Sequence, residues 1–467
     1  MTASFSPHQV KEATQGRWVQ PAPEADLQGV YTDTRKPRPG GLFVPLRGPH
    51  FDGHNFLAEA ARQGAVAILA EEQYLAEHTK QAQQLTVPIL AVGDTLYALG
   101  ELARAYRASL SPRTIAVTGS VGKTTVKNLI ASVAEQRYNV HSSRKNFNNL
   151  IGLPLETLEM TYSAEILIVE CGADRPGEVA RLTEIAQPHI GVITHVVPCH
   201  LERLGTLRRV AEEKGKLLAG LQEPAPCAVV NVAAAERDTL LENCKAPVRF
   251  YGRQAESVVW AEREHLNDDG TPTFHICDAQ HRFEVRLRIV GAHQVENALA
   301  AATVGRLLDI PPEDVKAGLE AYAGCWGRMQ RTLLPDGTVL IEDVYNSNPV
   351  SMQAALDFLA QSSQRPRVGV FGEMWDLGEK SEYWHQQIGQ RITKEHLEVL
   401  LTVGPKAQGF FEAAKHGPQP AERIHHFDTT AEALPWLRAN RQSGGLILIK
   451  GSRGMKMESL SEGLKSG

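Results

Sequence analysis

Short apolar runs separated by glycine- and proline-rich turns characterise the first 93 residues of the chain. The runs over residues 42–46, 65–70 and 89–92 have the length of strands, and the turn Pro-Arg-Pro-Gly-Gly at 37–41 precedes the first of them. Short apolar runs between turn signals are typical of buried strands. We therefore expect a small α/β unit in this part of the chain.

From about residue 94 the pattern changes to a regular alternation of apolar strand, glycine turn and amphipathic helix. This alternation is typical of βαβ units, in which helices cover the faces of a parallel sheet. The strands that we expect in this part are residues 114–118, 166–170, 190–194 and 228–232. A Gly-Cys-Trp-Gly stretch then precedes a second series of expected strands, at 339–342, 367–371, 399–403 and 446–450.

These changes of pattern divide the chain into three parts. At about 150 residues per domain, 467 residues correspond to about three domains. We predict three packed α/β domains: a small N-terminal domain over residues 1–93, a central domain with a mainly parallel sheet over 94–325, and a Rossmann-like C-terminal domain over 326–467.

The composition narrows the class of protein. Hydrophobic residues make up 42% and charged residues 22% of the chain, as in ordinary globular proteins, so a disordered chain is excluded. The 49 basic and 54 acidic residues give a net charge of −5 without a basic block, which disfavours a nucleic-acid binder. Apolar runs are far shorter than the roughly 20 residues of a membrane helix, and the N-terminus has no export signal. The six cysteines form no CxxC pair, which argues against zinc and disulfides. We expect a cytoplasmic protein without stable membrane insertion.

The strongest chemical signal is the segment Gly-Ser-Val-Gly-Lys-Thr-Thr at 119–125, between an expected strand and an expected helix. It is a shortened form of the phosphate-binding pattern GxxxxGK[ST], with two residues between the glycines. The N–H groups of such a turn and the start of the following helix attract phosphate. Lys123 would contact the β- and γ-phosphates, and the Thr124 hydroxyl would bind Mg²⁺. The alternative is an ordinary βα turn with a solvated lysine. We expect ATP to bind at Gly119, Ser120, Gly122, Lys123, Thr124 and Thr125.

Polar residues also stand at the ends of two further expected strands. Glu170 ends the run Ile-Leu-Ile-Val-Glu, and His200 follows the strand at 190–194. Ligands of α/β sheets bind at the edge formed by the carboxyl ends of the strands, and Mg²⁺ prefers oxygen ligands. Glu170 is therefore a candidate metal ligand, although a strand-end glutamate is often simply solvated. His200 by itself is more typical of a structural histidine.

The helix expected after Thr206 carries a lysine, Lys214, in the middle of its apolar stripe. The stripe follows the i, i+3, i+4, i+7 spacing of a helix face, and its members are Leu207, Val210, Ala211, Leu217, Leu218 and Leu221. Lys214 could extend its ammonium past this stripe to water. Alternatively, it is held in an active site, where desolvation favours the neutral, reactive amine.

His293 and Asn297 stand four residues apart at the start of an alanine-rich helix, and Arg328 directly follows the Gly-Cys-Trp-Gly junction. The histidine and the asparagine could face a ligand, but helix capping or surface exposure explains them equally well. Arg328 could reach a phosphate from between two domains, or it could form a surface salt bridge.

The expected C-terminal domain contributes two polar turns. Asp343 ends an expected strand and is followed by a turn that contains Asn346. Lys450 and Ser452 belong to a strand-to-glycine turn near the end of the chain, which is suited to an anion but is a weak signal alone.

Together these segments resemble the Mur ligase family, the ATP-dependent amide-forming enzymes of peptidoglycan assembly. The resemblance runs through nearly the whole chain, in the order of the family. It is carried by DTRKPRPGGLFVPLRGPHFDGHNF (33–56), NFNNLIGLPL (146–155), CGADRPGEVARL (171–182), DVYNSNPVSMQAAL (343–356), GEMWDLGEKSEYWHQQIG (372–389) and IKGSRGMKME (449–458). Within the family, the motifs are most similar to those of the members that join D-alanyl-D-alanine to UDP-N-acetylmuramoyl-tripeptide.

The resemblance implies catalytic and metal-binding roles for individual residues. Lys123 and Thr124 match the family's P-loop, and Glu170 and His200 match two of its magnesium ligands. Lys214 matches a lysine that CO₂ converts to a carbamate, which supports a second Mg²⁺. With Arg328, the residues Lys123, His200 and Lys214 form the implied catalytic set.

The resemblance also implies contacts with the nucleotide and the substrates. It places His293 and Asn297 on the adenine side, and Arg328 and Asp343 at other parts of the nucleotide. The implied substrate contacts are Asp33, Thr34, Arg35 and Arg47 for the UDP-sugar, Asn148 and Asn149 for the acceptor loop, and Asn346, Lys450 and Ser452 in the C-terminal domain, which would bind the amine substrate.

The resemblance implies a monomer that uses ATP and two Mg²⁺ ions and has no nucleic-acid partner. The carboxylate of UDP-N-acetylmuramoyl-tripeptide would become an acyl phosphate, which the amine of D-alanyl-D-alanine would attack. Two alternatives stay open: a related ligase with a different acceptor, such as a Mur-like paralogue or a folylpolyglutamate synthase, and a P-loop ATPase switch that joins nothing.

Overall fold

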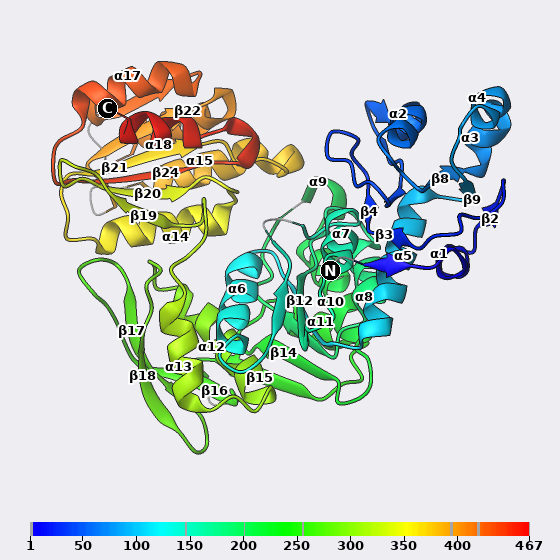
Figure 1. The fold of residues 1–467 in the computed structure, drawn as a ribbon. Helices are drawn as coiled ribbons and strands as arrows, with labels where there is room; N and C mark the ends of the chain where they lie inside the picture. Colours follow the sequence, from blue (N-terminus) through cyan, green and yellow to red (C-terminus); the bar gives the residue numbers. More distant parts are fainter. Residues whose placement is uncertain are drawn as a thin grey trace.

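The computed structural model describes residues 3–144, 147–199, 201–254, 256–392, 396–417 and 421–466. Three sheets follow one another along the chain, and helices cover their faces (Figure 1). The N-terminal sheet, in blue, and the C-terminal sheet, in yellow to red, lie on opposite sides of the central one (Figure 1). The predicted architecture of three α/β units with mainly parallel sheets is confirmed.

The first sheet has five strands in the order β2-β9-β8-β5-β4, and all neighbours except β2 and β9 run parallel. Two small antiparallel ribbons, β1 with β3 and β6 with β7, complete the unit. The strands are β1 (Ser4–Phe5), β2 (Arg17–Trp18), β3 (Leu27–Gln28), β4 (Val30–Tyr31), β5 (Leu42–Phe43), β6 (Arg47–Gly48), β7 (Phe51–Asp52), β8 (Ala67–Glu71) and β9 (Ile89–Val92), and the helices are α1 (Pro7–Thr14), α2 (Leu57–Arg62), α3 (Glu72–Glu77) and α4 (Thr79–Gln83).

The central sheet has nine strands in the order β11-β12-β10-β13-β14-β15-β16-β17-β18, parallel as far as β16 and antiparallel beyond it. Its strands are β10 (Arg113–Thr118), β11 (Val140–Ser142), β12 (Ile166–Glu170), β13 (Ile190–Ile193), β14 (Cys227–Asn231), β15 (Val248–Gly252), β16 (Val259–Leu266), β17 (Pro272–Cys277) and β18 (Arg282–Arg286). Its helices are α5 (Thr95–Leu110), α6 (Lys123–Ala134), α7 (Gly152–Leu158), α8 (Glu178–Ala186), α9 (Leu201–Leu204), α10 (Leu207–Ala219), α11 (Arg237–Leu241), α12 (Gln294–Leu307) and α13 (Pro312–Ala321).

The C-terminal sheet has six strands in the order β19-β20-β24-β21-β22-β23, and only the pair of β19 and β20 is antiparallel. Its strands are β19 (Gln330–Leu333), β20 (Val339–Asp343), β21 (Arg367–Gly372), β22 (Val399–Val403), β23 (Ile424–Phe427) and β24 (Leu446–Lys450). Its helices are α14 (Pro349–Gln361), α15 (Ser381–Arg391), α16 (Gln408–Lys415), α17 (Thr430–Asn440) and α18 (Glu458–Lys465), and the short turns η2 (Gly378–Lys380) and η5 (Arg453–Met455) lie at its strand ends.

The expected strands all overlap observed ones, because their apolar runs are buried between helices, as in β12 and β14. β5 is shorter than the expected run over 42–46. The sequence analysis did not identify β15 to β18, since strands such as β16 and β18 are partly exposed and rich in charged residues. All six cysteines are free thiols. In the part of the chain that the structure describes, no helix has the length and apolarity needed to cross a bilayer.

The three units pack on one another in different ways. The N-terminal and central units share one continuous apolar core, to which α5 contributes, and the hydroxyl of Tyr106 donates to the carbonyl of Met160 at 2.7 Å. The C-terminal unit meets the central one in several places: Val290 of the central unit packs into the C-terminal core, Gly270, after β16, lies against the ring of Phe358, and Gly378 lies against residue 202.

Candidate functional site

The phosphate-binding loop connects β10 to α6, and its two glycines adopt left-handed conformations. Gly119 has φ +147° and Gly122 has φ +84°. A Cβ at Gly119 would lie 2.0 Å from the Oγ1 of Thr194, and one at Gly122 would lie 2.7 Å from the Oδ1 of Asn297. The loop therefore passes directly against the end of β13 and against α12, and only glycine fits at these two positions.

The side chain of Lys123 forms hydrogen bonds with the backbone of the loop. Its ammonium donates to the carbonyl oxygens of Gly119 at 2.8 Å and Ser120 at 3.1 Å. Desolvation lowers the pKa of Lys123 to about 8, and repulsion from Lys214 acts in the same direction. A phosphate bound here would add negative charge beside these two lysines. Lys214 itself is only 1% exposed, so its ammonium does not extend to bulk water.

Thr124 is the centre of a polar cluster that joins four segments. Its hydroxyl donates to Oε2 of Glu170 at 2.7 Å, and the side-chain amide of Asn148 donates to Oε1 of the same carboxylate at 2.8 Å. Arg328, from the junction between the central and C-terminal units, donates to the Thr124 hydroxyl at 3.1 Å and stacks on the ring of Tyr345 at 4.1 Å. Both sides of the buried carboxylate are thus hydrogen-bonded, and the junction is tied to the start of α6.

The oxygen atoms of this cluster suit Mg²⁺. Thr124 and Glu170 offer a hydroxyl and a carboxylate, and Mg²⁺ uses few protein oxygens because it keeps several waters and binds substrate phosphates. Among the described residues no group of three His, Cys, Asp or Glu side chains forms a metal site by itself. His200, the other expected ligand, lies outside the described residues.

A pocket of about 420 Å³ opens beside the loop, between the central and C-terminal units. Lys450 donates to Oδ2 of Asp343 at 2.5 Å and to the carbonyl oxygen of Asn346 at 2.9 Å, which orders the C-terminal wall. The structure thus brings together in one pocket nine residues expected from the sequence: Ser120, Gly122, Thr125, His293, Asn297, Arg328, Asp343, Asn346 and Lys450.

One wall of this pocket is formed by the start of α12, next to the P-loop. The side-chain amide of Asn297 donates to Oε1 of Gln294 at 2.8 Å. The ring of His293 packs against Gly291, and a Cβ at Gly291 would lie 2.6 Å from this ring. Desolvation lowers the pKa of His293 to about 4, so the ring is neutral near pH 7. Glu296 was missed by the sequence analysis, although it stands between His293 and Asn297.

Glu296 belongs to an ion-pair network in the same wall of the pocket. Its carboxylate accepts from the Nε2 of His195 at 2.6 Å, and it also contacts the guanidinium of Arg253. Arg253 follows a strand that the sequence analysis did not identify, so its place in the pocket could not be predicted.

The residues expected at the UDP-sugar lie apart from this cluster, in the N-terminal unit. Arg35 forms a forked ion pair with Asp33, with the closest atoms 2.8 Å apart, and these hydrogen bonds lower the pKa of Asp33 to about 2. Thr34 is buried. Arg47 pairs with two carboxylates, Glu71 at 2.9 Å and Asp52 at 3.0 Å.

Two of the expected substrate residues have local structural roles. The side chain of Asn149 accepts from the backbone N–H of Gly152 at 2.8 Å at the start of α7. The hydroxyl of the buried Ser452 accepts from the backbone N–H of Trp375 at 2.9 Å. These contacts position the two loops, and neither side chain lines the pocket beside the P-loop.

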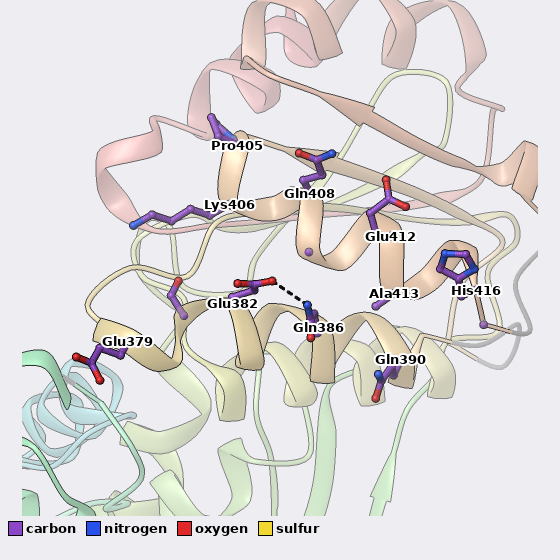
Figure 2. A pocket seen from close by; sticks show the side chains of 13 residues that line it. Glu379, Glu382, Gln386, Gln390, Pro405, Lys406, Gln408, Glu412, Ala413 and His416 are labelled. Carbon is purple, nitrogen blue, oxygen red and sulfur yellow. Dashed lines mark hydrogen bonds between the residues drawn. The ribbon is translucent and has the colours of Figure 1, made fainter.

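A second hollow, of about 860 Å³, lies between α15 and α16 in the C-terminal unit (Figure 2). Its side chains are polar, and Gln386 donates to the carboxylate of Glu382 at 3.1 Å across one helical turn (Figure 2). None of the expected site residues that the structure describes lines this hollow.

Comparison with known proteins indicates the family of the chain. Three family models match the chain: "Mur ligase family, catalytic domain" over residues 26–107, "Mur ligase middle domain" over 117–305 and "Mur ligase, glutamate ligase domain" over 327–453. The UDP-N-acetylmuramoyl-tripeptide–D-alanyl-D-alanine ligase of Bacillus subtilis (strain 168) is 34% identical over 460 residues, 97% of each chain.

Two solved structures extend the likeness to the fold. MurF from Acinetobacter baumannii aligns over the full length of both chains with a TM-score of 0.90 and 28% identity. The MurF ligase from Thermotoga maritima in complex with ADP covers 94% of this chain and 97% of its own, with a TM-score of 0.80 and 26% identity. With three family models in order and a relative that is similar from end to end, the chain belongs to the Mur ligase family.

Proposed function

We propose that the chain is an ATP-dependent ligase that joins D-alanyl-D-alanine to UDP-N-acetylmuramoyl-tripeptide, in the cytoplasm, as a step of peptidoglycan precursor synthesis. The observation that carries the proposal is the meeting of Thr124, Glu170 and Arg328 beside a pocket built from two units. The B. subtilis relative has this activity in its name, and the two MurF structures support the same assignment.

ATP would occupy the pocket beside the P-loop. Lys123 and the N-terminus of α6 would hold the terminal phosphates, and Arg328 would neutralise charge as the phosphoryl group moves. His293, neutral near pH 7, and Asn297 would contact the adenine side, and Asp343 would contact another part of the nucleotide. The complex of the T. maritima relative with ADP supports the use of an adenine nucleotide.

Mg²⁺, in one or two ions, would be held by Thr124, Glu170 and His200, and would neutralise the phosphate charge. Lys214 is the candidate for carbamylation by CO₂. As a carbamate it would carry a negative charge beside Lys123 instead of a second positive one, and it could then serve as a further oxygen ligand. Its burial and its repulsion of Lys123 support this assignment.

The reaction would proceed in two steps. A carboxylate oxygen of the tripeptide attacks the γ-phosphorus of ATP, the bond to the bridging oxygen breaks, and ADP leaves. The amine of the dipeptide then forms a bond to the acyl carbon, the C–O bond to phosphate breaks with its electron pair on phosphate, and the amine nitrogen releases a proton. In both steps the residues of the site act mainly by positioning and charge neutralisation.

The three units would divide the work. The N-terminal unit over residues 1–93 would bind the UDP-sugar through Asp33, Thr34, Arg35 and Arg47. The central unit over 94–325 would bind ATP and present the tripeptide near Asn148 and Asn149. The C-terminal unit over 326–467 would bind the amine substrate, with Asn346, Lys450 and Ser452 in its loops. The ligase would act as a monomer.

Phosphate release and coupled product measured together test the proposal. A ligase of this kind releases phosphate only when UDP-N-acetylmuramoyl-tripeptide and D-alanyl-D-alanine are both present, and UDP-N-acetylmuramic acid without peptide gives no product. The Lys123→Ala variant should stay folded and lose turnover, because Lys123 lies on a ligand-binding loop.

Other outcomes would point to other functions. Coupling to UDP-N-acetylmuramic acid alone, or to a folate-type acceptor, would assign a different ligase reaction. Phosphate release that needs neither substrate would indicate an ATPase switch. Unchanged turnover of Lys123→Ala would remove the P-loop from the mechanism.

A further inference from the structure

A third hollow, of about 470 Å³, lies in the C-terminal unit at the amino ends of its parallel strands. Its lining comes from the starts of β21, β22 and β23, from the last turn of α17 and from the segment after that helix. The pocket beside the P-loop reaches instead the carboxyl end of β24, the neighbour of β21, at Lys450. The five residues of β24 span about 16 Å, so this hollow is separate from the proposed active site.

Three arginines line this hollow, which we call the arginine hollow: Arg365, Arg423 and Arg441. The order of the strands brings two of them together, because β21, β22 and β23 are parallel neighbours. Arg365 stands two residues before β21, and Arg423 directly precedes β23. The backbones of these two strands are about 10 Å apart. Arg441 directly follows α17 and supplies the third guanidinium group.

The one carboxylate in the described lining, Glu398, is already bound by another arginine. Arg367 is buried and does not belong to the lining, and its guanidinium donates to the two oxygens of Glu398 at 2.7 Å and 3.1 Å. Arg365 lies 3.3 Å from the same carboxylate. Glu398 therefore balances at most one of these two arginines.

The other two arginines of the hollow have little negative charge beside them. Arg441 lies 3.5 Å from the carboxylate of Asp336, and the exposed Arg423 forms no ion pair or hydrogen bond with a described residue. In the part of the chain that the structure describes, four arginines, Arg367 included, thus share two carboxylates. Two positive charges remain in excess, although the chain as a whole carries a net charge of −5.

This excess of charge matches a phosphate group better than a carboxylate. A phosphate monoester carries a charge of about −1.5 to −2 at pH 7, whereas a carboxylate carries only one negative charge. Guanidinium groups also bind phosphate oxygens through two parallel hydrogen bonds. The volume of about 470 Å³ lies in the range of small-molecule pockets and leaves room for an organic part of the ligand.

Trp436 of α17 offers a flat surface for that organic part. Its half-buried indole lines the hollow, with the centre of its ring 4.3 Å from that of His425 and 6.3 Å from that of Phe427. These neighbours hold the indole in place. Aromatic rings stack on such a surface, and the side chains of Asn440 and Gln442 add amide groups to the same lining. A ligand with a phosphate and a flat polar ring fits this combination.

We propose that the arginine hollow is a second nucleotide site, which binds a nucleoside monophosphate. Arg423 and Arg441 hold the phosphate, and Trp436 packs against the base. The assignment goes beyond the proposed ligase activity and does not depend on it, because all described residues of the lining belong to the C-terminal unit and none lines the pocket beside the P-loop.

Equilibrium dialysis with radiolabelled AMP counts the molecules that each chain binds. Wild-type protein should bind two, one beside the P-loop and one in the arginine hollow, and Lys123→Ala should weaken only the first. In the Lys123→Ala background, Arg423→Gln should weaken the remaining site about 10- to 100-fold, because hydrogen bonds between charged groups are lost. Arg441→Gln should have the same effect. Arg423 is exposed and unpaired among the described residues, so its variant stays informative if Arg441→Gln does not fold.

A further variant separates a nucleotide from phosphate alone. Trp436→Leu, again in the Lys123→Ala background, should weaken AMP binding about 10-fold, because the base loses its stacking partner. Its affinity for radiolabelled inorganic phosphate should stay within about twofold of the parent protein, since the arginines are unchanged. AMP binding that is equal in Trp436→Leu and in the parent would overturn the assignment of a nucleotide.

Arg391→Gln is the matched control. Arg391 is an exposed arginine of α15 in the same unit, it donates to the side chain of Gln353 at 2.9 Å, and it does not line the hollow. Its AMP binding should match that of the parent protein. A single AMP per chain in the wild type, or a second site that Arg423→Gln leaves unchanged, would refute the proposal.

Discussion

Substitution of Gly119 by alanine tests how closely the P-loop is held against the sheet. A Cβ at this position would lie 2.0 Å from the hydroxyl of Thr194, which is fully buried and donates to the carbonyl of Val121 at 2.7 Å. Left-handed backbone costs a residue other than glycine about 1–2 kcal/mol, and overpacking of a buried site adds about 1–3 kcal/mol. Gly119→Ala should therefore lower the free energy of unfolding by about 2–5 kcal/mol.

Gly177→Ala is the matched control for the backbone term. Gly177 also has a positive φ, +94°, in the central unit, but a Cβ there would meet nothing within 4 Å. Its cost should stay near 1–2 kcal/mol, the backbone term alone. Urea unfolding measures both variants, and calorimetric titration with ADP measures the effect on the loop. Gly119→Ala should weaken ADP binding more than about 10-fold, whereas Gly177→Ala should leave it unchanged.

A double variant shows whether Thr194 is the cause of the difference. Removal of the hydroxyl in Gly119→Ala/Thr194→Ala should make the combined loss of stability smaller than the sum of the two single losses, by about 1–2 kcal/mol for residues in contact. Equal losses of stability in Gly119→Ala and Gly177→Ala, or additive losses in the double variant, would show that the close approach is not the reason for glycine at this position.

Three further predictions concern the polar residues of the site. Arg328→Lys should reduce kcat/KM for ATP by about 10- to 100-fold in the coupling assay, since it loses the hydrogen bond to Thr124 and the flat contact with Tyr345; a rate within twofold of wild type would contradict this. The pKa of His293, about 4, lies below its usual value of 6.5, so the folded state binds fewer protons than the unfolded state between these pH values and loses stability as the pH falls. Urea unfolding at pH 7 and pH 5 should show a loss that is smaller by about 1–2 kcal/mol in His293→Gln, and equal losses would refute the shift. Lys214→Ala should lose most activity with a normal Tm and should be partly rescued by acetate, and a wild-type rate in this variant would exclude the carbamate.

The P-loop and its carboxylate could be predicted from the sequence because local rules determine both. The glycines and the adjoining strand fix the course of the loop, and β10 and β12 are parallel neighbours, with Val117 opposite Glu170. A carboxylate at the end of β12 therefore lies beside the start of α6, where Thr124 stands, whatever the rest of the chain does.

The remaining contacts of the site depend on packing between units and could not be derived from spacing. The contact of Arg328 with Thr124 joins residues 204 positions apart and depends on where the C-terminal unit sits. For Asn149 the motif suggests a substrate contact, whereas in the structure its side chain accepts a hydrogen bond at the start of α7.

The division of the nucleotide pocket between two units has a consequence for inhibitors. Asn297 and Lys450 stand on opposite walls, and the walls belong to two units that are connected through a short junction and also meet around Val290, Gly270 and Gly378. A compound that contacts both walls binds only those protein molecules in which the two units are correctly spaced. Its apparent affinity is therefore its intrinsic affinity multiplied by the fraction of such molecules. A compound confined to the central wall escapes this penalty. The apparent affinity of an inhibitor for this pocket should therefore depend on whether it contacts one wall or both, as well as on the strength of each contact.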